Sequence, residues 1–122
     1  MAELVNDGGQ GVKLINSGTI DRYYFLWGDR ECRYLGSRYL SPVIPAGRLA
    51  ELPPKRLAQA RTPKIVIAGM TLRLECNADV YGEFLAGKSP SIVLPSPPVD
   101  LRFLLGILNS KVVDYFYSTV RW

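Results

Sequence analysis

Aromatic and basic side chains alternate over residues 22–39, and these residue types suggest binding chemistry. Flat rings stack on nucleobases or pack against sugars, while guanidinium groups reach phosphates and base edges. The alternation therefore indicates a nucleic-acid-binding surface. The alternative interpretation is that most of the rings belong to the core and most of the arginines to a solvated rim. The residues that alternate are Arg22, Tyr23, Tyr24, Trp27, Arg30, Arg33, Tyr34, Arg38 and Tyr39.

Within this stretch, and in two later segments, seven residues are candidate contacts to nucleic acid. Arg73 lies on the polar side of an expected strand, and Lys88 with Ser89 follows a glycine in an expected exposed turn. For Lys88 and Ser89, contact with a phosphate and simple exposure to solvent are both possible interpretations. Trp27 is better interpreted as a ring in the core than as a platform on which a base stacks. The seven candidates are Arg22, Tyr24, Arg33, Arg38, Arg73, Lys88 and Ser89.

Several classes of catalysis are excluded by what the sequence lacks. There is no histidine, so Ser-His-Asp and Cys-His catalysis are impossible and a zinc site is not expected. No GxGxxG, GxxxxGK[ST] or GxSxG motif is present. The two cysteines, Cys32 and Cys76, form no metal or redox spacing, and we expect Cys76 to be a small buried hydrophobe. We therefore predict no active site, no bound cofactor and no metal in this chain.

Composition and charge fit one soluble domain. The 122 residues carry a net charge of +4, and most of the 15 basic residues are arginine, which suits phosphates and guanine edges. No apolar run is long enough to cross a membrane, and the acidic, glycine-rich start is not a signal peptide. We expect a cytoplasmic protein with a flexible leader at residues 1–11 and one domain at residues 12–122.

The elements that would position these residues are organised around residues 64–77. Ile65, Val66 and Ile67 form a short apolar run after Pro63, and from Leu72 apolar and polar residues alternate up to residue 77. The pattern predicts a β-hairpin with one buried face, from whose other face Arg73 projects. Further strands are expected at residues 12–16, 81–85 and 91–94, and residues 19–27 are a short strand or an irregular segment.

Two helices are expected. Pro53 and Pro54 can open a short helix that runs to about residue 61. Asp100 is a good N-cap for a helix over residues 100–118, whose apolar positions recur at helical spacing. Near its end, Asn109 and Ser110 suit helix packing better than contact with DNA. The apolar positions are Leu101, Leu104, Leu105, Leu108, Val112 and Phe116.

Five segments resemble the TaqI-like C-terminal specificity domain. These are LINSGTIDRYYFLWG, RYLSPVIP, PKIVIAGMTLRLECNAD, GEFLAGKSPSIVLP and DLRFLLGILNSKVVDYF, which together span residues 12–117. Domains of this family serve type II restriction-modification enzymes and N6-adenine DNA methyltransferases. The resemblance implies a domain that reads double-stranded DNA, while a separate methyltransferase domain or subunit binds S-adenosylmethionine.

The chain also departs from the pattern of that family. Many members have arginines directly after the first hairpin strand, where this chain has Ala68, Gly69 and Met70. DNA contact then falls to Arg73, Lys88 and residues 22–38. No asparagine precedes a proline, so the Asn-Pro-Pro-aromatic loop of an adenine-methylating site is missing. We expect the chain to be a piece of a longer enzyme.

The sequence therefore predicts an α+β fold, a small twisted mixed sheet with a packed C-terminal helix. The function that the resemblance implies is sequence-specific DNA target recognition without catalysis. The alternative is a structural or protein–protein interaction module that uses its aromatic and basic face as a partner interface.

Overall fold

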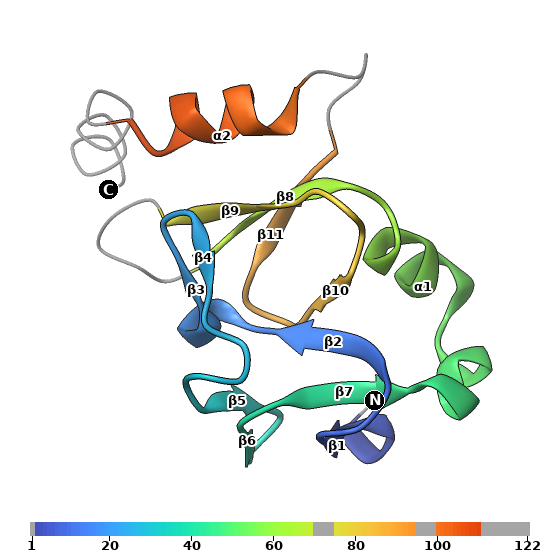
Figure 1. Ribbon diagram of the computed structural model, residues 1–122. Helices are drawn as coiled ribbons and strands as arrows, with labels where there is room; N and C mark the ends of the chain where they lie inside the picture. Colours follow the sequence, from blue (N-terminus) through green and yellow to red (C-terminus); the bar gives the residue numbers. More distant parts are fainter. Residues whose placement is uncertain (1, 70–74, 95–99, 111–122) are drawn as a thin grey trace.

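The computed structural model describes residues 2–69, 75–94 and 100–110 (Figure 1). Short strands alternate with three 3-10 turns (η) and two helices. The strands are β1 Asn6–Asp7, β2 Gly11–Ile15, β3 Ile20–Asp21, β4 Tyr24–Phe25, β5 Cys32–Tyr34, β6 Ser37–Tyr39, β7 Pro42–Pro45, β8 Lys64–Ile67, β9 Cys76–Asp79, β10 Phe84–Ala86 and β11 Ser91–Val93. The helices are η1 Ala2–Leu4, η2 Ser17–Thr19, η3 Ala46–Glu51, α1 Pro54–Ala60 and α2 Leu101–Leu108.

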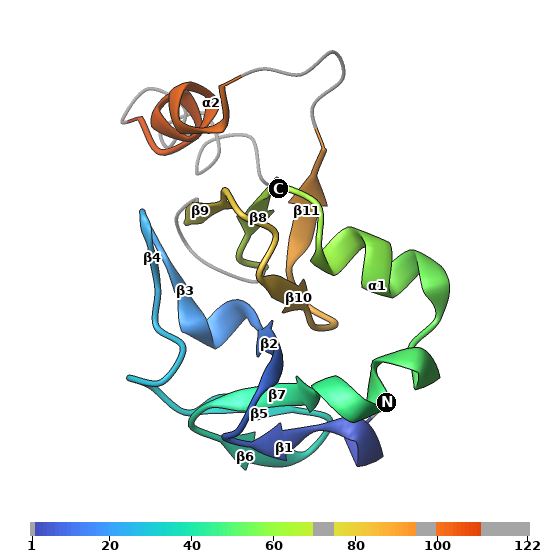
Figure 2. The same cartoon turned by 45° about the vertical axis from the view of Figure 1, so that its right-hand side comes forward.

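Two sheets form the body of the domain, and the predicted α+β class is confirmed. The larger sheet has the order β1-β7-β2-β10, in which β2 and β10 are parallel and the other pairs antiparallel. The smaller sheet has the order β11-β8-β9 and is antiparallel. α2 lies over the smaller sheet and α1 beside β10 (Figures 1 and 2). Two separate hairpins, β3–β4 and β5–β6, complete the fold.

The predicted central hairpin is present as β8 and β9. Ile67 pairs with Cys76 and Lys64 with Asp79, and the Cys76 side chain is buried as expected. The second strand is described over Cys76–Asp79, and Leu72 and Arg73, where the predicted alternation starts, lie outside the described residues.

Helix α2 is shorter than the helix predicted over residues 100–118. Asp100 caps it as expected, because its carboxylate accepts the backbone N–H of Arg102 at 2.9 Å. The helix ends at Leu108 and Asn109 is its C-cap, while Val112 and Phe116 lie outside the described residues. The buried Asn109 side chain bonds to the Cys76 backbone, which confirms its expected role in helix packing.

The N-terminal segment differs from the flexible leader expected for residues 1–11. Leu4 and Val5 are buried in one core cluster with Leu14 and Ile44. β1 pairs with β7, so the segment covers an edge of the larger sheet. Two apolar residues in a polar, glycine-rich stretch give little sequence signal, which explains the difference.

Several other elements match the expected ones, whereas strands β5, β6 and β7 were not expected. α1 begins at Pro54 and ends at Ala60, close to the predicted bounds, and it buries Ala60. Residues 19–27 form the β3–β4 hairpin, and Trp27 packs against the core and donates its indole N–H to the Pro42 carbonyl at 2.9 Å. The strand expected at 81–85 is found at Phe84–Ala86. Within the part of the chain that the structure describes, no helix has the length and apolar character needed to cross a membrane.

Candidate nucleic-acid interface

Two of the predicted site residues, Arg33 and Arg38, lie on the β5–β6 hairpin, residues 32–39, called the basic hairpin here. Strand alternation turns Cys32 and Tyr34 into the core and leaves Arg33 and Arg38 exposed on the outer face. The register places Arg33 directly opposite Arg38. Like charges at opposed positions destabilise a hairpin, so an anion between the two guanidinium groups would relieve their repulsion.

The turn of the basic hairpin has an unusual backbone. Leu35 has φ +49° and Gly36 has φ +86°, so both central residues of the two-residue loop are left-handed. Such a loop matches the twist of a hairpin, but asparagine and glycine adopt it far more easily than leucine. Leu35 is also 44% exposed. An apolar side chain is thus held outward at the hairpin tip, between the two arginines.

An open hollow lies on this hairpin. Its volume is about 480 Å³, and Arg33, Tyr34, Leu35, Gly36 and Arg38 line it. The hollow therefore combines two positive charges with an apolar tip. Phosphate contact from the arginines together with apolar contact from the tip is a combination found at nucleic-acid surfaces.

One acidic residue lies close to these charges. The Glu31 carboxylate is 3.9 Å from the Arg38 guanidinium, and both side chains are well exposed. An exposed ion pair of this length is weak and screened by salt. Arg38 can therefore exchange Glu31 for a phosphate at little cost.

The residues beneath the arginines are chemically inert. Burial raises the pKa of the Cys32 thiol above its ordinary value, and burial likewise raises the pKa of the Tyr34 hydroxyl. Both groups stay neutral at physiological pH, so they support the hairpin from inside without adding charge.

The second group of predicted residues, Lys88 and Ser89, is attached to the basic hairpin through Asn16. Asn16 Nδ2 donates to the Arg33 carbonyl at 2.8 Å, and Asn16 Oδ1 accepts from the Ser89 hydroxyl at 2.6 Å. Ser17 Oγ donates to Ser89 Oγ at 2.7 Å. The Ser89 hydroxyl is thus engaged within the protein, which makes Ser89 a positioning residue.

Lys88 lies between this network and a tightly packed glycine. A Cβ on Gly87 would lie 2.9 Å from Asn16 Oδ1 and 3.2 Å from the Tyr34 ring, so only glycine fits without a shift of its neighbours. The close approach brings the turn against β5. Lys88 is exposed in this turn, next to Ser89, which Asn16 joins to the Arg33 backbone.

Arg22 and Tyr24 lie on a different hairpin. The β3–β4 tip is next to β9, where the Tyr23 N–H donates to the Cys76 carbonyl at 3.0 Å. Tyr24 is 68% exposed and Arg22 is partly buried. The structure therefore pairs Arg33 with Arg38, joins the Lys88–Ser89 turn to the Arg33 backbone through Asn16, and places Arg22 and Tyr24 in a separate group.

Two contributors to the interface had no role in the sequence prediction. Asn16 gave only a turn signal, although its amide joins segments far apart in the chain. Leu35 gave no signal, because its left-handed backbone depends on the hairpin register. A Leu-Gly pair between two strand-like triplets could have indicated a two-residue turn.

Comparison with known proteins gave no match among family models, curated proteins or solved structures. Among the described residues, no group of histidine, cysteine and carboxylate side chains is arranged to hold a metal ion.

Proposed function

We propose that this chain is a DNA target-recognition module of an N6-adenine methyltransferase or restriction-modification enzyme. The observation that carries the proposal is the opposed pair Arg33 and Arg38 on the exposed face of the basic hairpin. Two cations at one register position fit adjacent backbone phosphates or a guanine edge. In this proposal S-adenosylmethionine binds to the methyltransferase domain and not to this chain.

Lys88 and Leu35 extend the same surface. Lys88 is exposed next to β5 and suits a phosphate, whereas Leu35 suits an apolar contact with a base or a thymine methyl group. The Asn16 network joins the turn that carries Lys88 to the Arg33 backbone.

The test is a salt titration of duplex binding by the whole chain, first on a random duplex pool and then on a selected sequence. Log affinity should fall with log salt at about 0.9 per phosphate neutralised. R33A and R38A should each lower that slope by about one if they contact phosphates, or cost about 1–3 kcal/mol at one base pair if they read an edge. K88A should lower the affinity for all duplex sequences equally.

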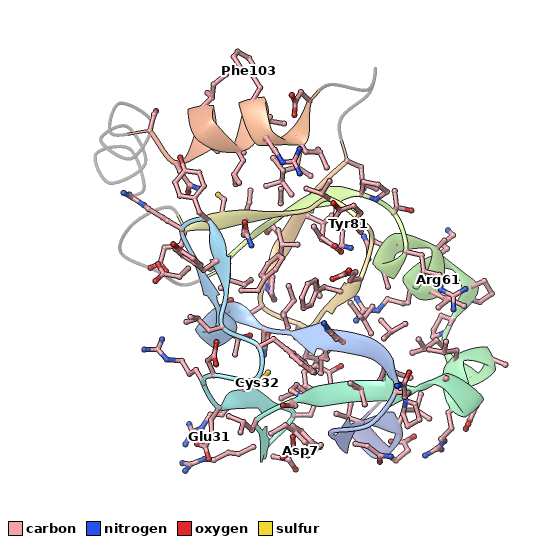
Figure 3. The ribbon with its side chains drawn as sticks, in the orientation of Figure 1. Asp7, Glu31, Cys32, Arg61, Tyr81 and Phe103 are labelled. Atoms are coloured by element: carbon pink, nitrogen blue, oxygen red, sulfur yellow. The ribbon has the colours of Figure 1, made fainter. Side chains whose placement is uncertain are left out.

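Arg61→Ala is the matched control. Arg61 is exposed and lies on the opposite side of the molecule from Glu31 and the basic hairpin (Figure 3). The R61A variant should bind duplex DNA with unchanged affinity and an unchanged salt slope. Salt-independent binding, or equal losses in R61A and R33A, would overturn the proposal.

A second candidate function is protein interaction through α2. Phe103 is 70% exposed and Ile107 is 45% exposed one turn later, so the outer side of α2 is apolar. We propose this side as the contact to the methyltransferase domain. Phe103→Ser should weaken association with that domain and leave duplex binding by the isolated chain intact; unchanged association would exclude this contact.

A further inference from the structure

Strand β9 has a partly open edge. It is the last strand of the β11-β8-β9 sheet, and the Ala68 N–H donates to the Glu75 carbonyl at 2.9 Å where β8 and β9 begin to pair. Antiparallel strands alternate residues that bond inward with residues whose backbone groups point outward. From this register, Asn77 bonds toward β8, while Cys76 and Ala78 direct their N–H and C=O groups away from the sheet.

The outward groups of Cys76 are fully occupied. The Cys76 N–H donates to Asn109 Oδ1 at 3.2 Å, and Asn109 Nδ2 donates to the Cys76 carbonyl at 3.0 Å. The Tyr23 N–H donates to the same carbonyl at 3.0 Å. The Asn109 carboxamide thus takes the place of a peptide group in a neighbouring strand.

The next outward position, Ala78, has no such partner. Within residues 2–69, 75–94 and 100–110, no group bonds to its outward N–H or C=O. A donor and an acceptor therefore lie side by side at the β9 edge. Adjacent polar backbone groups of this kind are what a planar ligand with its own acceptor and donor can bind.

A cavity of about 360 Å³ lies at this position, which is within the usual range for small-molecule sites. Leu105, which is buried, supplies apolar surface, and Arg102, which is exposed, supplies a positive charge. Asp100 is nearby, but its carboxylate caps the backbone N–H of Arg102. The lining residues are Tyr23, Asn77, Ala78, Val80, Arg102 and Leu105.

Tyr23 contributes an aromatic wall from a strained backbone. Its φ is +67°, a left-handed value that costs a non-glycine residue about 1–2 kcal/mol, and its side chain is 51% exposed. Strain of this kind is often found at binding sites. Tyr23 lies in the turn of the β3–β4 hairpin and lines the cavity beside β9.

We propose that this cavity binds one unstacked nucleotide. The Ala78 N–H and C=O would bond to the pairing edge of the base, which carries a donor beside an acceptor in every nucleobase. Tyr23 would stack on the base and Arg102 would contact its phosphate. An added peptide strand does not fit, because Asn109 and Tyr23 already close the edge at Cys76 and leave one residue free.

The inference rests on the β9 edge and not on the basic hairpin, so it can be tested separately from duplex binding. The probe is each nucleoside 5′-monophosphate, titrated into the whole ¹⁵N-labelled chain. We expect the Ala78 amide resonance to shift at saturation. N6,N6-dimethyl-AMP lacks the donor of AMP and should bind at least several-fold more weakly.

Two variants test the side chains. Tyr23→Gly removes the ring and suits the left-handed backbone, so it should keep the fold and lose about tenfold or more in affinity. Arg102→Gln should weaken binding and reduce its salt dependence. Arg61→Gln is the control, since Arg61 does not line the cavity, and this variant should bind as the wild type does.

The source of the nucleotide is distinguished by a duplex with one extrahelical nucleotide. If free nucleotides shift the Ala78 amide resonance, the cavity binds a free nucleotide. If only the bulged duplex shifts this resonance, the cavity binds a base from DNA. No Ala78 shift with either probe, or a shift that Y23G leaves unchanged, overturns the inference. The double variant R33A/R38A should still bind free nucleotides, and its failure to do so would equally contradict a site independent of the hairpin.

Discussion

Lys64 Nζ and Asp79 Oδ2 lie 2.5 Å apart inside the domain, with both side chains almost fully buried. Lys64 also donates to the carbonyls of Ala60 and Thr62, at 3.1 and 3.3 Å. Asp79 accepts the backbone N–H groups of Glu83 and Phe84. The pair therefore links α1, β8, β9 and the start of β10 through fully bonded charges.

The first prediction is that Lys64→Met lowers the free energy of unfolding by about 3–5 kcal/mol, because Asp79 is left as a buried charge without its partner. Urea unfolding measures the loss. Lys55→Met, at an exposed lysine of α1, is the control and should change little. Equal effects of the two variants would show that the ion pair does not stabilise the fold.

The second prediction compares the two sides of α2. Leu105 is buried against Ile65 and Cys76, so L105A should cost about 2–5 kcal/mol. L108A should cost less, since Leu108 is only partly buried. F103A should stay within about 0.5 kcal/mol, because Phe103 is exposed. Thermal unfolding measures the loss of stability in each variant. A larger loss in F103A than in L105A would contradict the placement of the helix.

The third prediction concerns alkaline pH. Burial raises the pKa of the Cys76 thiol from 9.0 to about 11. The folded state therefore keeps a proton that the unfolded state loses, and this contribution to stability is complete below pH 9 and disappears as the pH rises toward 11. At pH 10 the thiol's contribution to the free energy of unfolding should be about 1 kcal/mol smaller than below pH 9.

Cys76→Ala isolates this effect. The pKa of Lys64 is lowered by burial, which acts in the opposite direction in the same pH range, but it is common to both proteins. The difference in unfolding free energy between wild type and C76A should narrow by about 1 kcal/mol between pH 8 and pH 10. A constant difference would show that the thiol titrates normally in the folded state.

The fourth prediction tests the turn of the basic hairpin. L35N should stabilise the domain by about 1 kcal/mol, because asparagine tolerates the left-handed backbone that leucine resists. The same variant should bind duplex DNA less well if Leu35 makes an apolar contact. Leu40→Asn replaces a leucine of similar exposure, 46%, outside the left-handed region, and it should show neither effect.

The elements with strong local signals were predictable from the sequence. Pro54 begins α1 and Asp100 caps α2, since both act on the residues directly beside them. The apolar run 65–67 was predicted to be a strand and lies in β8. A strand that is buried on both faces has apolar residues at successive positions, which gives a clear signal in the sequence. Cys76 was predicted to be buried from the alternation around it.

The remaining features depend on contacts between distant segments. A lysine at this position would be expected at the exposed end of a strand, and its burial depends on Asp79 together with the carbonyls of Ala60 and Thr62. The Asn16 amide joins Arg33 to Ser89, which no periodicity indicates. The cavity at Ala78 depends on which backbone groups β8 leaves unpaired, and register cannot be read from one strand alone.

The parallel pairing of β2 with β10 has a consequence for synthesis on the ribosome. Lys13, Leu14 and Ile15 pair with Phe84, Leu85 and Ala86, so an early strand depends on residues made much later. Until then β2 presents an unpaired edge to other nascent or unfolded chains. A product that terminates before Phe84 should therefore be prone to aggregation, whereas completion of β10 closes that edge.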